Sequence, residues 1–268
     1  NLPPQESAFW AAISVAIVSI LFGYKGHRIT PKQIWESISG GGRASAEIIV
    51  IGAMAGIIIA ILDRTGLGQA LTLILAAVGE DSLFLLLILT ALVSILLGMG
   101  MPTSAIYLLL ATMIAPSLIK LGVHPIAAHM FVLYFGLMSM ITPPVAIAAF
   151  AAASLSGAKP METGVTAVRL GWIAYVIPFV FVLSPSLLWQ GNSSDILMAA
   201  VTAFMGVWIA SCGVIGFMFG PLSALTRLLF FVAGILLLLP ADALPYGLVI
   251  NGIGLVLGIL LLSKDYIS

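Results

Sequence analysis

The sequence predicts an all-α, polytopic membrane protein whose apolar helices are interrupted at two places. Apolar residues make up 62% of the 268 residues, and charged residues only 7%. A soluble domain carries about a quarter charged residues, so a chain of this composition needs lipid to cover its apolar surface. The interruptions fall at Gly98–Thr103 and Thr142–Val145, where glycines or prolines break apolar runs.

Composition and motifs also exclude several classes of function. The ten basic and ten acidic residues give a net charge of zero, so no electrostatic argument favours a nucleic-acid partner. The single cysteine, Cys212, excludes an intrachain disulfide. No HExxH, GxSxG or P-loop pattern occurs, and His129 within an apolar run is typical of a hydrogen-bonded interior histidine. We therefore expect neither an enzyme nor a cofactor.

The N-terminal part predicts two spanning helices and two segments at the membrane surface. Apolar runs at about 8–24 and 44–62 approach the roughly 20 residues that a span requires. Segment 31–40 starts with a proline and carries its charges on one face, so we expect an interfacial helix. Residues 67–79 are too few to span and are expected to lie along the interface. The first domain covers residues 1–43.

Two short apolar runs follow, at 82–98 and 104–119, with only Met99–Thr103 between them. Two short helices joined by a tight turn favour a re-entrant hairpin over 82–119. Two ordinary spans with a short loop are the alternative. The charge pattern does not decide between them, because both arrangements return the chain to the same side.

The first break has the sequence GMGMPTS at 98–104. Its two glycines allow φ values that other residues resist, and Pro102 suits the start of the following helix. At membrane depth such backbone lines a cavity or is buried in protein. Its carbonyls and the hydroxyls of Thr103 and Ser104 can coordinate a cation, while the helix N-terminus can face a carboxylate. A plain loop with glycine and proline as turn residues is the alternative.

The second break has the sequence SMITPPV at 139–145, inside an apolar run over 126–156. Pro143 and Pro144 remove two helical hydrogen bonds and exclude helical geometry at Thr142, so the helix unwinds and frees carbonyl groups. A proline kink repaired by neighbouring helices is the alternative. Paired broken helices are the pattern of secondary-transporter sites. Because the predicted membrane cores hold almost no charge, a sodium ion is favoured over a proton.

The rest of the chain predicts one more long helix at 164–190 and then an accessory tail. The tail, residues 194–268, has unbroken apolar runs and no polar cluster. The residues before it, 44–193, form the predicted central domain. Its three helices are expected at 195–218, 223–240 and 244–262.

The basic residues predict an orientation. If residues 25–43 are cytoplasmic, counting the spans places eight of the ten Lys and Arg residues on that side, as the positive-inside rule favours. Arg64 and Lys120 are left outside. The eight are Lys25, Arg28, Lys32, Arg43, Lys159, Arg169, Arg227 and Lys264.

Residues 96–171, which contain GMGMPT and ITPPV, resemble the large membrane subunit of tripartite ATP-independent periplasmic (TRAP) transporters. The likeness extends from about Gly41 to Pro185, including AGIIIAILDRTGLG, and is best to the fused permease that works with TAXI-type solute-binding proteins. It implies an elevator-type carrier of two inverted repeats, each with a re-entrant hairpin and a broken helix. Only the second repeat and the tail are present, so the N-terminal half would be missing.

The resemblance also implies where ligands bind, at the hairpin tip and the unwound helix. The implied substrate-binding residues are Pro102, Thr103, Ser104, Pro143 and Pro144. The implied sodium-binding residues are Gly98, Gly100, Met101, Thr103, Ser139, Met140, Thr142 and Val145.

The function implied is sodium-coupled import of an organic anion (a carboxylate) across the bacterial inner membrane. A periplasmic solute-binding protein of the TAXI type would deliver this small-molecule substrate, and the other partners would be the missing permease half and the lipid bilayer. The chain starts Asn1-Leu2-Pro3-Pro4, which resembles a fragment more than a signal peptide. Two alternatives are a non-transporting scaffold or assembly subunit, and an intramembrane enzyme with Ser104 or Ser139 as nucleophile, which no motif supports.

Overall fold

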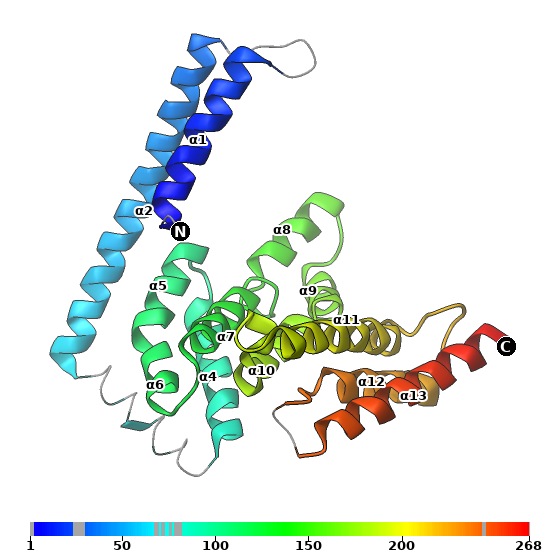
Figure 1. The fold of residues 1–268 in the computed structure, drawn as a ribbon. Coiled ribbons are helices and arrows are strands. Elements are labelled where there is room, and N and C mark those ends of the chain that lie inside the picture. The colour runs from blue at the N-terminus through cyan, green and yellow to red at the C-terminus, as the bar shows by residue number, and fades with distance from the viewer. Residues whose placement is uncertain are drawn as a thin grey trace. The chain divides into compact units, whose positions relative to one another are not determined.

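The structure is a computed structural model that describes residues 3–23, 30–66, 82–242 and 245–267, with the single positions 70, 73, 74 and 77. These residues are overwhelmingly helical and form no strand beyond one isolated bridge between Phe217 and Pro221. The expected all-α class is therefore confirmed (Figure 1). The chain divides into two compact units, Asn1–Met54 and Ala55–Ser268, and each is described by itself.

The first unit holds α1, Pro4–Leu21, and the start of α2, Pro31–Thr65. A reciprocal cap begins α2: the backbone N–H of Thr30 donates to Gln33 Oε1 at 2.9 Å, and that of Gln33 donates to Thr30 Oγ1 at 3.4 Å. The helix then continues through 40–42, where two separate helices were expected. That expectation was wrong because glycines weaken a helix by only about 1 kcal/mol each and no proline ends it. The predicted interfacial segment 67–79 lies outside the continuously described residues.

The second unit opens with a group of short helices on either side of the two expected breaks. The 104–119 run is two helices rather than one, because Pro116 begins a new helix after Ile114. The single helix expected at 164–190 is also divided, at Gly171 and again at Ser184. In order these elements are α4 (Leu83–Gly98), α5 (Thr103–Met113), α6 (Ala115–Lys120), α7 (Pro125–Met138), α8 (Ile147–Ser156), α9 (Pro160–Leu170), α10 (Ile173–Leu183) and the 3-10 helix η1 (Pro185–Leu188).

Helix α7 lies at the centre of this group and packs against α4, α5, α6 and α10. Its apolar residues point in all directions, as expected of a helix surrounded by others. Phe131 and Phe135 are buried, and both place their rings edge-on to Phe179 of α10, with centroids 5.3 and 5.6 Å apart. His129 of α7 is hydrogen-bonded to Tyr107 of α5, Nδ1 to hydroxyl 3.2 Å, which confirms the expected interior histidine.

The tail consists of α11 (Ser193–Ile215), α12 (Ala224–Leu238) and α13 (Gly247–Ile267), close to the bounds predicted. Consecutive helices pack against one another. Asn251 of α13 is buried, and its amide donates to the carbonyls of Leu236 and Leu239, both at 2.9 Å, at the C-terminal end of α12. Those carbonyls have no partner within their own helix, so the side chain satisfies them.

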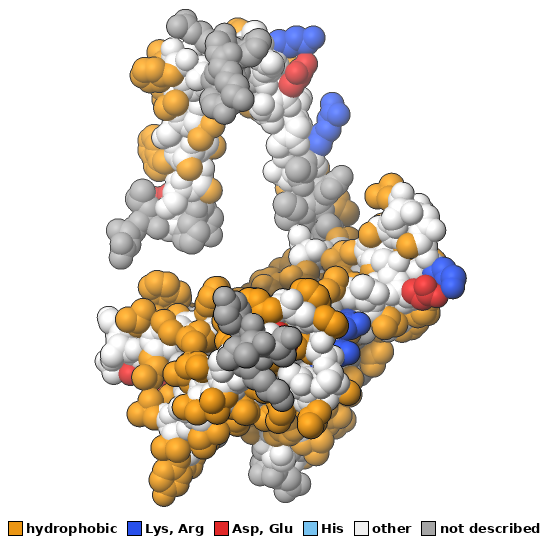
Figure 2. All heavy atoms as spheres, turned by 90° about the vertical axis from the view of Figure 1, so that its right-hand side faces the viewer, with side chains coloured by type: hydrophobic (Ala, Val, Ile, Leu, Met, Phe, Trp, Pro, Cys, Tyr) orange, Lys and Arg blue, Asp and Glu red, His pale blue; other side chains and the backbone are white. Residues whose placement is uncertain are grey.

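Within the described residues, three segments are long and apolar enough to cross a membrane: Thr103–Lys120, Pro160–Leu183 and Ser193–Ile215. Several shorter apolar helices accompany them. Figure 2 shows hydrophobic side chains over most of the visible face of the second unit, with few charges among them. Leu155 and Phe204 are 92% and 77% exposed, which is the surface expected of a polytopic membrane protein in contact with lipid.

Candidate functional site

The two breaks meet, although about 40 residues of chain separate them. Gly98, the last residue of α4, lies against the end of α7. A Cβ added to Gly98 would stand 2.6 Å from the carbonyl oxygen of Gly136 and 2.9 Å from Ser139 Oγ. Real Cβ atoms essentially never come so close, so only glycine allows the first break to contact the second.

A second contact joins the residues just after the first break to the second one. The Thr103 hydroxyl, at the start of α5, lies 4.0 Å from the sulfur of Met140, to which it donates. One turn further, Ile106 packs on Gly136 so closely that a Cβ at that glycine would lie 2.5 Å from Ile106 Cγ2. Both helices of the α4–α5 pair are thus held against the C-terminal end of α7.

The first break is a turn of four residues in which Gly100 and Pro102 are exposed and Met99 and Met101 are half-buried. Met99 leaves α4 in an extended conformation, and Gly100 has a φ of +80°, which favours glycine. Pro102 takes the N-cap position of α5, one residue earlier than the first-turn position expected, and provides no side-chain cap. The first N–H groups of α5 therefore point into the turn without a helical partner, beside the exposed side chains of Thr103 and Ser104.

The second break is a compact unwound segment from Ser139 to Ala146, which confirms the interruption predicted at 142–145. Some of its carbonyls are engaged: Met140 accepts from the N–H of Ala148 at 3.0 Å, and Thr142 accepts from that of Ala146 at 3.1 Å. Others have no backbone donor among the described residues. These are the carbonyl oxygens of Ser139, Ile141, Pro143, Pro144 and Val145.

Helix α10 contributes a residue that the sequence analysis missed. The hydroxyl of Tyr175 lies 2.7 Å from Thr142 Oγ1, which also donates to the carbonyl of Met138 at 2.5 Å. Because a threonine hydroxyl has one hydrogen, Tyr175 is the donor in the first bond. One lone pair of Thr142 remains for another partner. The only sequence signal was a polar hydroxyl in an apolar run.

Helix α9 supports the proline pair from the other side. A Cβ on Gly164 would lie 3.0 Å from Pro143 Cγ, so this glycine sets how closely α9 approaches the break. Met101, Thr142, Pro143 and Val145 are half-buried here, whereas Gly100, Pro102, Ser104 and Pro144 are exposed.

The chemistry available at the two breaks is neutral. Among the described residues, no group of three or more His, Cys, Asp or Glu side chains could hold a metal ion. The groups present are carbonyl oxygens, hydroxyls and the first N–H groups of α5. They can hold a weakly bound monovalent cation and a carboxylate.

Most of the chain, including both breaks, matches one known protein family. A family model described as "Tripartite ATP-independent periplasmic transporter, DctM component" matches residues 2–196. The chain belongs to this family. The TRAP large-permease resemblance is thereby confirmed, and both breaks lie inside the matched region, which ends at the start of α11.

One relative is a protein named "C4-dicarboxylate TRAP transporter large permease protein DctM" from Pseudomonas aeruginosa. It is 27% identical over 183 residues, which are 68% of this chain and 41% of the relative. The TRAP chain thus spans about two fifths of the length of the relative that it matches. No solved structure matches it.

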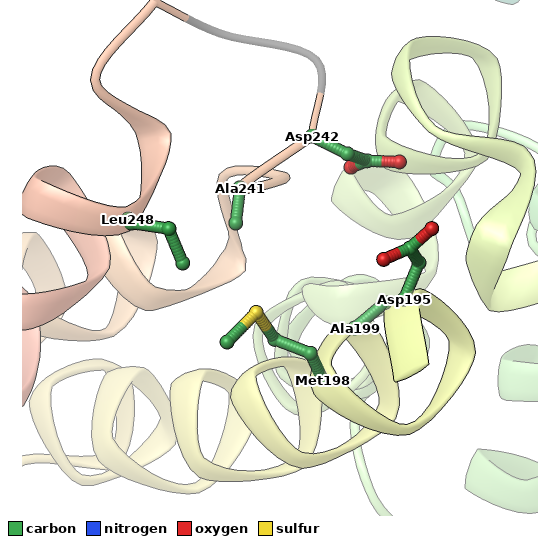
Figure 3. A pocket seen from close by; sticks show the side chains of 6 residues that line it. All are labelled: Asp195, Met198, Ala199, Ala241, Asp242 and Leu248. Carbon is green, nitrogen blue, oxygen red and sulfur yellow. The ribbon is translucent and has the colours of Figure 1, made fainter. Parts of the chain in front are cut away.

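A separate cavity of about 150 Å³ lies away from the breaks of the TRAP chain, and Figure 3 shows Asp195 and Asp242 facing each other across it. Asp242 precedes α13, and one of its oxygens accepts from Ser184 Oγ at 2.8 Å and from Ser186 Oγ at 3.1 Å. Both serines are nearly buried, at 1% and 5% exposure. This carboxylate therefore fastens the α12–α13 loop to η1 and its preceding residue.

We expect Asp242→Ala to lower the free energy of unfolding by about 1–3 kcal/mol, because two buried hydroxyls lose their acceptor. Thermal unfolding of the chain in detergent measures the effect. Asp195→Ala is the matched control: it removes a carboxylate from the same cavity whose hydrogen bonds are local, to Asn192 and Ser194. If Asp242→Ala lowered the free energy of unfolding no more than the control does, the hydrogen bonds from Ser184 and Ser186 to Asp242 would not stabilise the fold.

Proposed function

We propose that this chain supplies one wall of a sodium and carboxylate site in a TRAP permease. The observation that carries the proposal is the meeting of the two breaks, at Gly98 with Ser139 and at Thr103 with Met140. Family membership makes the chain a component of a TRAP transporter permease. Neither break alone would distinguish a site from an ordinary loop.

The second break is suited to sodium. Its carbonyls at Ser139, Ile141 and Pro143 and the remaining lone pair of Thr142 are uncharged oxygens in one unwound segment. Unwound backbone at helix ends is how secondary transporters coordinate sodium. The other residues that the family resemblance implies for sodium contribute backbone that shapes the site; they are Gly98, Gly100, Met101, Met140 and Val145.

The first break is suited to a carboxylate. The free N–H groups at the start of α5 and the positive end of its dipole attract an anion. Thr103 and Ser104 add exposed hydroxyls, and Pro102 directs the turn. Pro143 and Pro144, on the opposite break, would form an apolar flank for the substrate.

The rest of the carrier would come from elsewhere in the permease. An elevator mechanism needs an opposing hairpin, and the relative has room for it, because the matched residues are only 41% of its length. In this proposal the hairpin 82–119 is re-entrant, the protein lies in the bacterial inner membrane, and a TAXI-type periplasmic solute-binding protein delivers the substrate. The printed name of the relative mentions C4-dicarboxylates, which supports a carboxylate as the substrate class.

The test is sodium-driven uptake by the complete permease in liposomes, with its binding protein. We expect Thr142→Ala to raise the sodium concentration for half-maximal uptake about tenfold or more. This is the effect expected when sodium loses one or more good oxygen contacts. Thr103→Ala should instead raise the KM for substrate. Thr142→Ser keeps the hydroxyl and should restore sodium dependence.

Thr112→Ala is the matched control, since this exposed threonine of α5 bonds only its own helix, at Leu108 and Leu109. It should leave both parameters unchanged. If uptake kept its rate and its sodium dependence in Thr142→Ala and Thr103→Ala, the site assignment would be refuted. A non-transporting scaffold would then be the better interpretation of this chain.

A further inference from the structure

Two arginines from different helices converge on the C-terminal end of α11. Arg169, in the last turn of α9, donates through Nε and Nη2 to the carbonyl of Val214, at 3.1 and 2.9 Å, and through Nη2 to that of Ile215 at 2.7 Å. Arg227, in the first turn of α12, donates to Gly213 at 3.1 Å and to Val214 at 3.0 Å. The two guanidinium groups therefore share one acceptor and lie side by side.

The packing around Arg227 leaves its guanidinium little room to move. A Cβ on Gly216 would lie 2.9 Å from its Nε and 3.0 Å from its Cζ. Gly216 also has a φ of +86°, so it is the glycine that ends α11. The guanidinium is thus placed by the fold and not by a flexible surface contact.

The two arginines retain unused charge and unused donors. Each guanidinium has five N–H groups; Arg169 uses three and Arg227 uses two in these bonds, which leaves five. Among the described residues, no salt bridge joins Arg169 or Arg227 to a carboxylate. The end of α11 offsets only about half a charge.

A groove of about 360 Å³ is lined by Arg227 and by mainly apolar surface. Its other lining residues are Gly213, Val214, Ala224, Leu228 and Phe231. Leu228 is 58% exposed. Beside it, Trp172 places its ring 5.7 Å from that of Phe231 and donates to Ser211 Oγ at 3.2 Å. A soluble anion would use the arginines but not this apolar surface.

We propose that Arg169 and Arg227 bind the phosphate of an anionic phospholipid whose acyl chain lies along this groove. Arginine suits the ligand because its planar fork matches two phosphate oxygens. The orientation predicted from the basic residues places both arginines at the cytoplasmic leaflet, where anionic headgroups bind basic pockets between helices. The site is separate from the two breaks and independent of the proposed transport function.

The experiment is native mass spectrometry of the full chain in detergent, titrated with phosphatidylglycerol or phosphatidylcholine. Phosphatidylglycerol is expected to bind more tightly than phosphatidylcholine. Arg169→Gln is expected to weaken the binding of phosphatidylglycerol about tenfold, because one charge-assisted contact is lost. Binding of phosphatidylcholine should weaken less, because its choline cation already offsets the charge of its phosphate. Lys159→Gln, which removes an exposed and ion-paired charge expected on the same side, should leave both affinities unchanged.

Inorganic phosphate distinguishes a lipid from a soluble anion. We expect that it fails to displace phosphatidylglycerol at equal concentration, because it cannot use the apolar groove. Displacement by phosphate would overturn the lipid assignment, and so would an unchanged phosphatidylglycerol affinity in Arg169→Gln. If Arg169→Gln does not fold, Arg169→Lys is the second variant, because it keeps the charge but lacks the planar guanidinium that matches two phosphate oxygens. It must then bind phosphatidylglycerol more weakly than the parent chain.

Discussion

Replacing Gly98 with alanine is expected to abolish sodium-driven uptake by the complete permease. The added methyl would lie 2.6 Å from the carbonyl oxygen of Gly136 and 2.9 Å from Ser139 Oγ. The first of these is a backbone atom in the last turn of α7, so it cannot rotate away. α4 must move from α7, which separates the two breaks. Overpacking of this kind costs about 1–3 kcal/mol.

Uptake and thermal unfolding measured on the same preparation separate a local from a global effect. We expect uptake to fall further than a loss of about 1–3 kcal/mol in stability explains, because a small shift misplaces the site. Gly252→Ala is the matched control. Gly252 lies inside α13 with no atom within 4 Å of an added Cβ, and alanine there should stabilise slightly. A Gly98→Ala permease with normal uptake would show that the breaks need not touch.

The second large effect is expected from Gly234→Ala in α12, which should separate the first two helices of the tail. A Cβ at this position would overlap the backbone nitrogen of Ala210 and lie 2.5 Å from the carbonyl oxygen of Gly206. The contact is reciprocal, because a Cβ on Gly206 would lie 2.8 Å from the carbonyl of Gly234. Both neighbours are backbone, so the two helices must move apart as rigid bodies.

We expect Gly234→Ala to lower the free energy of unfolding by about 3 kcal/mol or more, at or above the upper end of overpacking effects. Unfolding of the chain in detergent, followed by circular dichroism, measures it. Gly252→Ala serves again as control, since it makes the same change on α13 without a close neighbour. Equal stability of the two variants would rule out a close α11–α12 contact. Uptake by Gly234→Ala would also show whether transport depends on the tail.

Local signals were sufficient where backbone chemistry decides the structure. Pro143 and Pro144 cannot continue a helix, and the structure unwinds there as predicted. The GMGMPT turn between α4 and α5 was readable for the same reason. Its functional meaning was not, because the individual ligand positions depend on which side chains and carbonyls face each other.

The features that were missed depend on contacts between distant parts of the chain. Tyr175 lies in an apolar run, and nothing local indicates that its hydroxyl meets Thr142 of another helix. The convergence of Arg169 and Arg227 on one carbonyl spans 58 positions of sequence and three helices. The break predicted near Gly40–Gly42 was wrong because a local signal was given too much weight: glycine permits a turn without requiring one, and α2 continues through these residues.

The bonds between Arg227 and the end of α11 also bear on how the tail enters the membrane. The last carbonyls of α11 have no partner in their own helix, and a guanidinium group that leaves water needs acceptors for its N–H groups. Arg227 and the carbonyls of Gly213 and Val214 satisfy each other. We therefore expect α11 and α12 to enter the membrane together as a helical hairpin, because each helix satisfies polar groups that the other would expose.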